Sequence, residues 1–291
     1  MLEKVAIVIL SYNNVKDTVE CIKSIYSNIE RNLFEIFLID NSTDEYYLKN
    51  IESKVNVYFS AKVNNNGYSH GNNVGIRKAI SLNFKYIMIL NNDTIVTRDC
   101  LQKLIDKVNN DENIGIVAPL IKRYSDNKIW SSGGSYRKLL CNYQMTSKNI
   151  TSDAECEFLT GCCFLAKSNL FQNIGLLKED YFMYNEDSEF CHRLKMYGYK
   201  NYLVKNSVVL HKVSVSSEAN SPFQLYYIYR NRIGFCYYEF KGLKRIYAIN
   251  VNKLQALYRY LILKKEGQRK EAKAVYYAIL DYKKINGKGR Y

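Results

Sequence analysis

Short aliphatic runs alternate with segments of helical periodicity over residues 1–120, and this alternation constrains the fold more than any other feature. The run at 5–10 (VAIVIL) is continuous, as is typical of a strand buried on both faces. Residues 15–27 then place apolar side chains at helical spacing, and 34–40 (FEIFLID) follows as a second strand. Strands that alternate with helices predict parallel βαβ units, so we expect an α/β fold with a doubly wound, mostly parallel sheet.

The remaining elements follow from the same patterns. We expect further strands at 55–59, 86–90, 115–119, 157–165 and 207–210, and helices at 45–52, 72–82, 99–109 and 186–197. From Pro222 to the C-terminus the pattern is helical. Residue 220 is therefore the predicted boundary between an α/β domain, 1–220 with halves 1–120 and 121–220, and a helical extension, 221–291.

Several classes of protein are disfavoured by what the chain lacks. Its first residues run directly into an apolar segment that is too short for a secretory signal, so we expect a cytoplasmic protein with eight reduced cysteines. No cysteine pair has the spacing of a zinc site. The sequence contains no stretch of about 18 apolar residues, so we expect no membrane-spanning helix.

Polar side chains follow three of the predicted strands. They are Ser11, Tyr12 and Asn13 after the first strand, Asp40, Asn41 and Ser42 after the second, and Asn91, Asn92 and Asp93 after the strand at 86–90. In doubly wound sheets, ligands bind at the carboxyl ends of the strands. The sequence therefore predicts a binding site at that edge.

Two of these carboxylates have a functional and a structural interpretation. Asp40 can accept the N3–H of a uracil or thymine ring, or it can cap a helix or a turn. Asp93, assisted by neighbouring amide oxygens, can hold a divalent cation that bridges a diphosphate, or it can form an Asx turn. For Asp40 taken alone we favour the cap or turn.

A loop rich in Asn and Gly, residues 64–75, runs into the helix predicted at 72–82 and contains Asn73. Glycines allow a ligand to approach the backbone, and a helix N-terminus offers free N–H groups to phosphate or sugar oxygens. The alternative is a flexible connector. The loop matches neither the dinucleotide fingerprint nor the Walker sequence.

A second group of ionisable residues lies near 186–211. Glu186 and Asp187 open a predicted helix, where the helix dipole alone would favour acids. A carboxylate crowded by a like charge also has a raised pKa, which suits a general base that deprotonates a hydroxyl. His211 ends the strand at 207–210 and is either a metal ligand or a structural histidine.

Taken together, the motifs resemble the family 2 inverting glycosyltransferases of the GT-A fold, especially the bacterial rhamnosyltransferase-like branch. The matching stretches are VAIVILSYNN, LIDNSTD, NNNGYSHGNNVGIRKA, YIMILNNDTIV, LTGCCFLAKSNLF, FMYNEDSEFCHRLKMYGY and VLHKVSVS. They occur in the expected order over about residues 4–216, and the block that contains Glu186 and Asp187 is the most specific.

The resemblance implies a nucleotide-diphospho-sugar donor bound by residues 1–120. The donor implied is a UDP- or dTDP-sugar, with dTDP-rhamnose as one candidate. The resemblance assigns nucleotide contacts to Ser11, Tyr12, Asn13, Asp40, Asn73 and Asn92, and metal binding (Mn²⁺ or Mg²⁺) to Asp93 and His211. It assigns the general base to Asp187 with Glu186 beside it, and the sugar and acceptor contacts to Gly161, Cys162 and Glu186. The acceptor implied is a hydroxyl of a glycan or lipid-linked glycan in bacterial surface polysaccharide synthesis.

One position departs from the family's pattern. Residues 91–93 offer a single carboxylate, Asp93, where fuller versions of the motif have two or three. We therefore expect weaker metal binding and tolerance of Mg²⁺. A catalytically silent nucleotide-sugar-binding partner is an alternative, against which the presence of Asp93, Asp187 and His211 argues.

The resemblance fades after about residue 240, where most of the net charge of +14 lies. Residues 241–291 hold 14 basic and 3 acidic side chains, so their net charge is +11. A peripheral platform on an anionic membrane at the inner face of the cell fits this composition. A packed extension or a homo-oligomer surface fits it equally well. Nucleic-acid binding through the tyrosine-rich tail leaves the polar strand ends unexplained, so we expect no nucleic acid partner.

Overall fold

The structure is a computed structural model that describes residues 2–213, 220–285 and 287–291. The strands are β1 Leu2–Ser11, β2 Phe34–Asp40, β3 Phe59–Lys62, β4 Phe84–Asn91, β5 Thr94–Val96, β6 Ile114–Arg123, β7 Ile129–Ser131, β8 Gly134–Arg137, β9 Asn142–Met145, β10 Ala154–Cys156, β11 Cys163–Lys167 and β12 Lys200–His211. The α-helices are α1 Val15–Asn28, α2 Tyr47–Glu52, α3 Tyr68–Ser81, α4 Cys100–Asn109, α5 Ser168–Ile174, α6 Glu186–Met196, α7 Pro222–Glu239, α8 Gly242–Lys265 and α9 Arg269–Asp281. A short 3₁₀ turn, Arg31–Leu33, precedes β2.

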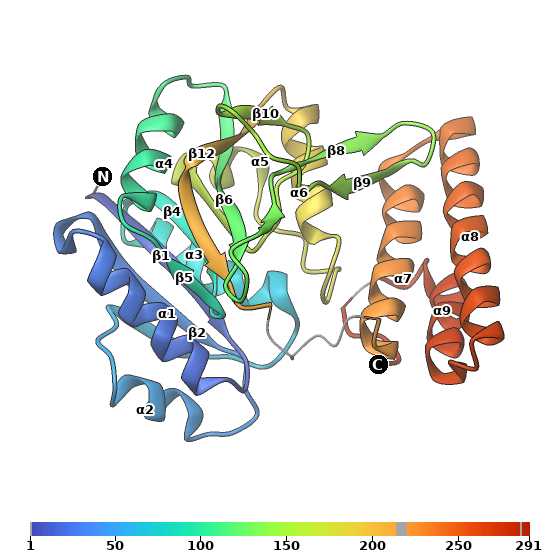
Figure 1. Ribbon diagram of the computed structural model, residues 1–291, viewed down its shortest axis with the longest axis horizontal. Coiled ribbons are helices and arrows are strands. Elements are labelled where there is room, and N and C mark those ends of the chain that lie inside the picture. The colour runs from blue at the N-terminus through green and yellow to red at the C-terminus, as the bar shows by residue number, and fades with distance from the viewer. Residues whose placement is uncertain (1, 214–219, 286) are drawn as a thin grey trace.

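One ten-stranded sheet organises residues 2–211, with the strand order β10-β12-β6-β11-β4-β1-β2-β3 and with β5 and β7 paired at its margin (Figure 1). The pairs β1–β2, β1–β4, β2–β3 and β6–β12 are parallel, as the alternating pattern predicts. In contrast, β11 runs antiparallel between β4 and β6, and β10 runs antiparallel to β12. The sheet is therefore mixed rather than uniformly wound, while its largest part is parallel.

This strand arrangement brings the predicted polar positions to one edge. Ser11, Asp40 and Asn91 are the last residues of parallel neighbours, with Ser11 paired to Asp40 and Leu10 to Asn91. Because β11 is antiparallel, its first residue, Cys163, lies at the same edge, paired with Leu90. His211 ends β12 and pairs with Thr94 of β5.

Alternation along the strands divides the core into two layers. On β1, Val5, Ile7 and Ile9 pack with apolar residues of α1, α2 and α4, whereas Ala6 and Val8 pack with those of α3, α5 and α6. Both faces of the strand are fully buried, as the continuous aliphatic run predicts.

Two predicted strands are misplaced along the chain. The strand expected at 55–59 begins only at Phe59, because β3 is an edge strand with β2 as its neighbour and its residues are only partly buried. The strand expected at 157–165 begins at Cys163, because residues 157–162 form the connection that carries Gly161 to the sheet edge.

The helical extension predicted after residue 220 is present as α7, α8 and α9 (Figure 1). The buried Arg230 of α7 lies over the ring of Tyr227, 4.7 Å from its centroid, and donates to the carbonyl of Gly287. Asp281 at the end of α9 accepts a 3.0 Å hydrogen bond from Tyr226. Gly287 also bridges to Tyr181, so the C-terminal segment reaches the α/β part of the molecule. Across the described residues, we find no helix with the length and apolarity needed to cross a bilayer.

Candidate active site

The ends of β1 and β4 are joined by a buried network of hydroxyl groups. The Ser11 hydroxyl lies 2.7 Å from that of Thr18 and 3.1 Å from that of Tyr47. Asn92 donates to the same Thr18 hydroxyl at 2.9 Å. Ser11 is fully buried, so its contribution is to hold this edge together rather than to present a free hydroxyl. Thr18, which was missed from the sequence, is the centre of the network.

Tyr12 and Asn13 lie beyond this network, at the surface. Tyr12 is 45% exposed, and Asn13 adopts a left-handed backbone with φ of 49°. An exposed aromatic ring directly after a strand end is available to stack on a flat ligand.

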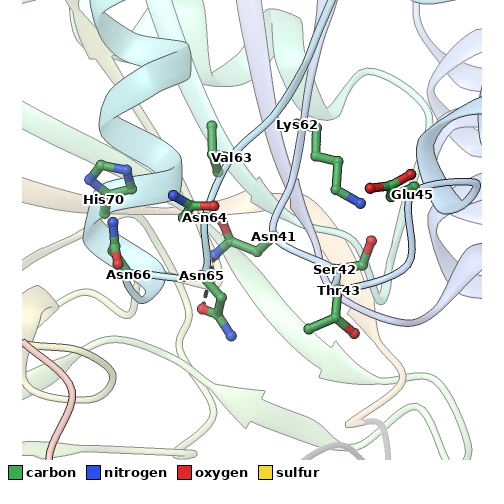
Figure 2. Close-up of a pocket in the computed structure, with 10 residues that line it drawn as sticks. All are labelled: Asn41, Ser42, Thr43, Glu45, Lys62, Val63, Asn64, Asn65, Asn66 and His70. Carbon is green, nitrogen blue, oxygen red and sulfur yellow. Dashed lines mark hydrogen bonds between the residues drawn. The ribbon is translucent and has the colours of Figure 1, made fainter.

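A pocket of about 910 Å³ opens beside the ends of β2 and β3 (Figure 2). Its lining comes from two loops and the start of α3, and consists of Asn41, Ser42, Thr43, Glu45, Lys62, Val63, Asn64, Asn65, Asn66 and His70. Amides and hydroxyls predominate, and Asn41 Nδ2 lies 3.5 Å from Asn65 Oδ1 across the pocket. Such groups can match the donor and acceptor edge of a heterocyclic base.

Asp40, next to the pocket, forms a turn, the interpretation favoured for this residue taken alone. Its carboxylate accepts 2.8 Å hydrogen bonds from the backbone N–H and the hydroxyl of Ser42, and the residue is fully buried. The carboxylate therefore shapes the turn that carries Ser42 and Thr43 into the pocket wall.

Asn73 is not brought to the edge of the sheet. Its amide donates to the carbonyl of Leu177 at 2.8 Å and to Glu179 at 2.9 Å, and accepts from the Leu177 N–H. Burial alone would raise the pKa of Glu179, but hydrogen bonds from Asn73, His70 and Arg77 outweigh it and lower that pKa to about 2. This ion cluster fixes α3 against residues 177–179.

Asp93 and His211 meet at the margin of the sheet because β5 pairs with β12. His211 Nε2 lies 3.1 Å from Asp93 Oδ1, and both side chains are nearly buried. The Trp130 ring meets the imidazole edge to face, with 4.5 Å between centroids. His211 Nδ1 is buried and has no hydrogen-bond partner among the described residues.

The pair fits a divalent cation through the chemistry of its donors. Asp93 offers a carboxylate oxygen and His211 an imidazole nitrogen, and both donor types suit Mn²⁺. Among the described residues no cluster of three or more His, Cys, Asp or Glu forms.

Gly161 and Cys162 link this edge to the acid pair. The Asn91 N–H donates to the Cys162 carbonyl at 2.9 Å, and the Gly161 N–H lies 3.3 Å from Asp187 Oδ2. A Cβ on Gly161 would lie 3.0 Å from the Tyr68 hydroxyl, which donates to the Gly161 carbonyl at 2.6 Å. A larger residue here would therefore have to displace the Tyr68 hydroxyl by a few tenths of an ångström. Tyr68 was missed from the sequence, although it lies within the predicted Asn/Gly loop.

Glu186 and Asp187 begin α6 as predicted, in an environment that disfavours their charges. Burial, and then the neighbouring Asp187, raises the pKa of Glu186 to about 8. Burial also raises the pKa of Asp187, although the backbone N–H groups of Gly161 and Ser188 oppose the shift. One Glu186 oxygen, Oε2, is buried without a hydrogen-bond partner. The pair therefore holds a proton near neutral pH.

The backbone before the acid pair is clamped by the helical extension. Asn231 of α7 is fully buried and donates to the carbonyls of Met183 and Tyr184 at 2.9 and 2.8 Å. Tyr184 and Asn185 both have left-handed backbones, with φ of 67° and 77°. Asn231 was missed from the sequence. Its only signal there is a polar residue between two arginines in an otherwise aromatic helix.

The structure has a mostly parallel sheet with a core layer on each face, an acidic residue after a strand end and an acid pair at the start of a helix. This is the architecture of the GT-A glycosyltransferases. The chain belongs to glycosyl transferase family 2, whose model matches residues 6–175, more than half of the chain. The match includes Asp40, Asp93 and Gly161 and ends before Glu186 and Asp187.

Known proteins that resemble the chain include the following three. It is 27% identical over 238 residues to the low-salt glycan biosynthesis hexosyltransferase Agl10 of Haloferax volcanii, covering 80% of this chain and 75% of that one. Its fold is similar to GalNAc-T7, solved with UDP, GalNAc and Mn²⁺ (TM-score 0.64, 18% identity, 79% of this chain and 47% of that one). It is also similar to the mannosyltransferase PcManGT of Pyrobaculum calidifontis, solved with GDP-Man and Mn²⁺ (TM-score 0.61, 14% identity, 96% and 86%).

Proposed function

We propose that the chain is an inverting hexosyltransferase that moves a sugar from a nucleoside diphosphate to a hydroxyl of a glycan or lipid-linked glycan. The observation that carries the proposal is the continuous link from Asn91 through Cys162 and Gly161 to Asp187. It joins the strand end that presents Asp93 to a carboxylate with a raised pKa, so a donor diphosphate and a general base would act on neighbouring atoms.

The pocket beside β2 and β3 is the proposed nucleoside site. Its amide-rich lining offers both donors and acceptors, and Tyr12 offers a stacking surface. UDP and dTDP are the proposed nucleotides. GDP should be tested beside them, because PcManGT was solved with GDP-Man.

Asp93 and His211 are the proposed holders of a divalent cation, which supplies positive charge to the leaving diphosphate when it is bound. GalNAc-T7 and PcManGT were both solved with Mn²⁺, which supports a divalent cation in this fold. With two protein ligands, we expect modest affinity and tolerance of Mg²⁺.

The proposed step is a single displacement. Asp187 takes the proton of the acceptor hydroxyl while the hydroxyl oxygen forms a bond to the anomeric carbon. The bond between that carbon and the diphosphate oxygen breaks, and its electron pair leaves with the diphosphate. The configuration inverts. Glu186 keeps its proton near neutral pH, which leaves the shared negative charge on Asp187.

The proposed setting is the synthesis of a surface polysaccharide or a related glycan, and dTDP-rhamnose is one of the proposed donors. The hexosyltransferase Agl10 is named for glycan biosynthesis, which supports the broader part of this assignment.

Two experiments test the proposal. The first is thermal unfolding with UDP, dTDP or GDP, each with and without Mn²⁺, and the second measures release of the nucleoside diphosphate from the corresponding nucleotide-sugars. One nucleotide should raise the unfolding free energy by about 2.7 kcal/mol at a ~100-fold excess over its Kd. Asp93→Asn should abolish the part of the shift that depends on Mn²⁺. Stabilisation without any sugar transfer or hydrolysis would instead indicate a catalytically silent binding protein, and no stabilisation by any nucleotide would refute the proposal.

A further inference from the structure

Helix α8 presents an apolar face that is largely exposed. Leu243, Ile246, Tyr247, Leu254, Leu257 and Leu261 are 45–85% exposed and follow the helical repeat, with Ile246 and Tyr247 adjacent. We call these six residues the α8 outer face. They project from the same side of the helix, with Asn250 among them.

The opposite side of α8 is the one that packs. Ala248, Asn252, Ala256 and Leu263 are fully buried against the rest of the extension and the β8–β9 hairpin. In Figure 1, α8 lies at the edge of the molecule remote from α1 and α2, with α7 and α9 on its inner side. The packing of α8 within the chain therefore does not use the outer face. Six large apolar side chains left exposed on one helix face are unusual in a folded protein.

The tip of the β8–β9 hairpin extends the outer face. The Tyr247 hydroxyl donates to the carbonyl of Leu139 at 3.0 Å, which places the two residues side by side. Leu139 is 78% exposed and follows Arg137 and Lys138. Two elements from separate parts of the chain thus contribute apolar and basic side chains to one surface.

The charge of this surface selects among partners. α8 contains six Lys or Arg residues and no Asp or Glu. Lys264 and Lys265 are exposed at its C-terminal end, whereas Arg245 donates to the Phe240 carbonyl and Arg259 to Asn220. A second copy docked through the same helix would bring these bases together without an acidic partner on the helix. An anionic lipid surface instead offers both an apolar layer for the leucines and negative headgroups for the lysines.

We propose that the α8 outer face, together with Leu139, docks the protein on an anionic phospholipid surface. The helix lies in the plane of the headgroups with its leucines among the acyl chains, and the flanking bases contact the headgroup phosphates. The proposal goes beyond the sugar-transfer chemistry and does not depend on it.

Co-sedimentation with phosphatidylcholine vesicles, with and without phosphatidylglycerol, tests the proposal on the full chain. The wild type should bind the vesicles that contain phosphatidylglycerol and release from them as salt rises. The double variant Leu254→Asp, Leu261→Asp should bind them about 100-fold more weakly. Met196→Asp is the matched control, because Met196 is 72% exposed on α6, away from the outer face, and its loss should leave binding unchanged.

Three further readouts make the outcome unambiguous. Circular dichroism and donor hydrolysis in solution should be the same for the double variant and the wild type. The test of membrane docking is thereby independent of the proposed hexosyltransferase activity. Equal binding to vesicles with and without phosphatidylglycerol would overturn it, as would equal binding by the double variant. A wild-type dimer in light scattering that the double variant converts to a monomer, without vesicle binding, would assign the face to a second copy instead.

Discussion

Glu186 and Asp187 determine the charge of the site because both carboxyl groups are removed from water at the start of one helix. Burial is the larger cause of the raised pKa of Glu186, and Asp187 adds to it. Asp187 differs in that it accepts hydrogen bonds from the Gly161 and Ser188 N–H groups, which favour its charged form. Adjacent residues of the same chemical class thereby acquire different tasks.

The raised pKa of Glu186 makes the folded state lose stability as pH rises. The folded protein holds a proton that the unfolded chain releases above the ordinary value of 4.5, so the stabilisation is lost as pH climbs from there to about 8. Glu186→Gln removes the titration. At about pH 9 the variant should therefore be more stable than the wild type by roughly 2 kcal/mol.

Urea unfolding over a series of pH values measures the difference. Glu112→Gln is the control, because the Glu112 side chain is 86% exposed and its replacement should leave the pH profile unchanged. Parallel pH profiles for Glu186→Gln and the wild type would contradict the assigned pKa.

At the scale of single residues, the sequence indicates which residues are candidates for the site better than it indicates which residues contact one another. The contact between Asp93 and His211 is anticipated only through the resemblance, since 118 positions separate the two residues and the pairing of β5 with β12 creates the contact. Asn73 shows the opposite case. Its place in an Asn/Gly loop suggests a ligand contact, but long-range contacts to residues 177–179 occupy its amide.

Among the elements, α7 contributes to the site without carrying any of the predicted site residues. Its Asn231 holds the carbonyls of Met183 and Tyr184, directly before the acid pair. We expect Asn231→Ala to lower kcat about tenfold while donor KM changes little, because the base loses its position and the nucleotide pocket is untouched. Unfolding free energy should fall by about 1–2 kcal/mol.

Asn252→Ala is the matched control for this variant. Asn252 of α8 is equally buried and also donates to a loop carbonyl, that of Leu140, but the loop is the β8–β9 hairpin. It should lose comparable stability and retain kcat. A proportional loss of kcat in both variants would show that Asn231 acts only through overall stability.

The elements themselves are predictable where apolar periodicity is strong. β1, β2, β4 and α1 are found within a few residues because their burial patterns are continuous or strictly helical. The antiparallel insertion of β11 between β4 and β6 is not, since strand direction depends on partners distant in the chain. That insertion is the step that delivers Gly161 and Cys162 to the site.

Across the whole molecule, the helical extension is tied into the α/β part rather than appended to it. Asn231 contacts the segment before α6, and the C-terminal Gly287 bridges to Tyr181. The high positive charge of residues 241–291 predicts the basic surface, but only the packing of α8 reveals which apolar residues remain outside. Composition alone leaves a membrane platform and a packed extension equally plausible. In the structure the extension is packed on one side and open on the other.

In the proposed mechanism, Asp187 deprotonates the acceptor at the end of the linked chain Asn91–Cys162–Gly161–Asp187. The most direct test is release of nucleoside diphosphate from the preferred donor, with acceptor and Mn²⁺, by Asp187→Asn and by the exposed control Asp180→Asn. We expect a rate about 1000-fold below wild type for Asp187→Asn, with unchanged nucleotide affinity, and a wild-type rate for Asp180→Asn. A wild-type rate in Asp187→Asn would contradict this mechanism.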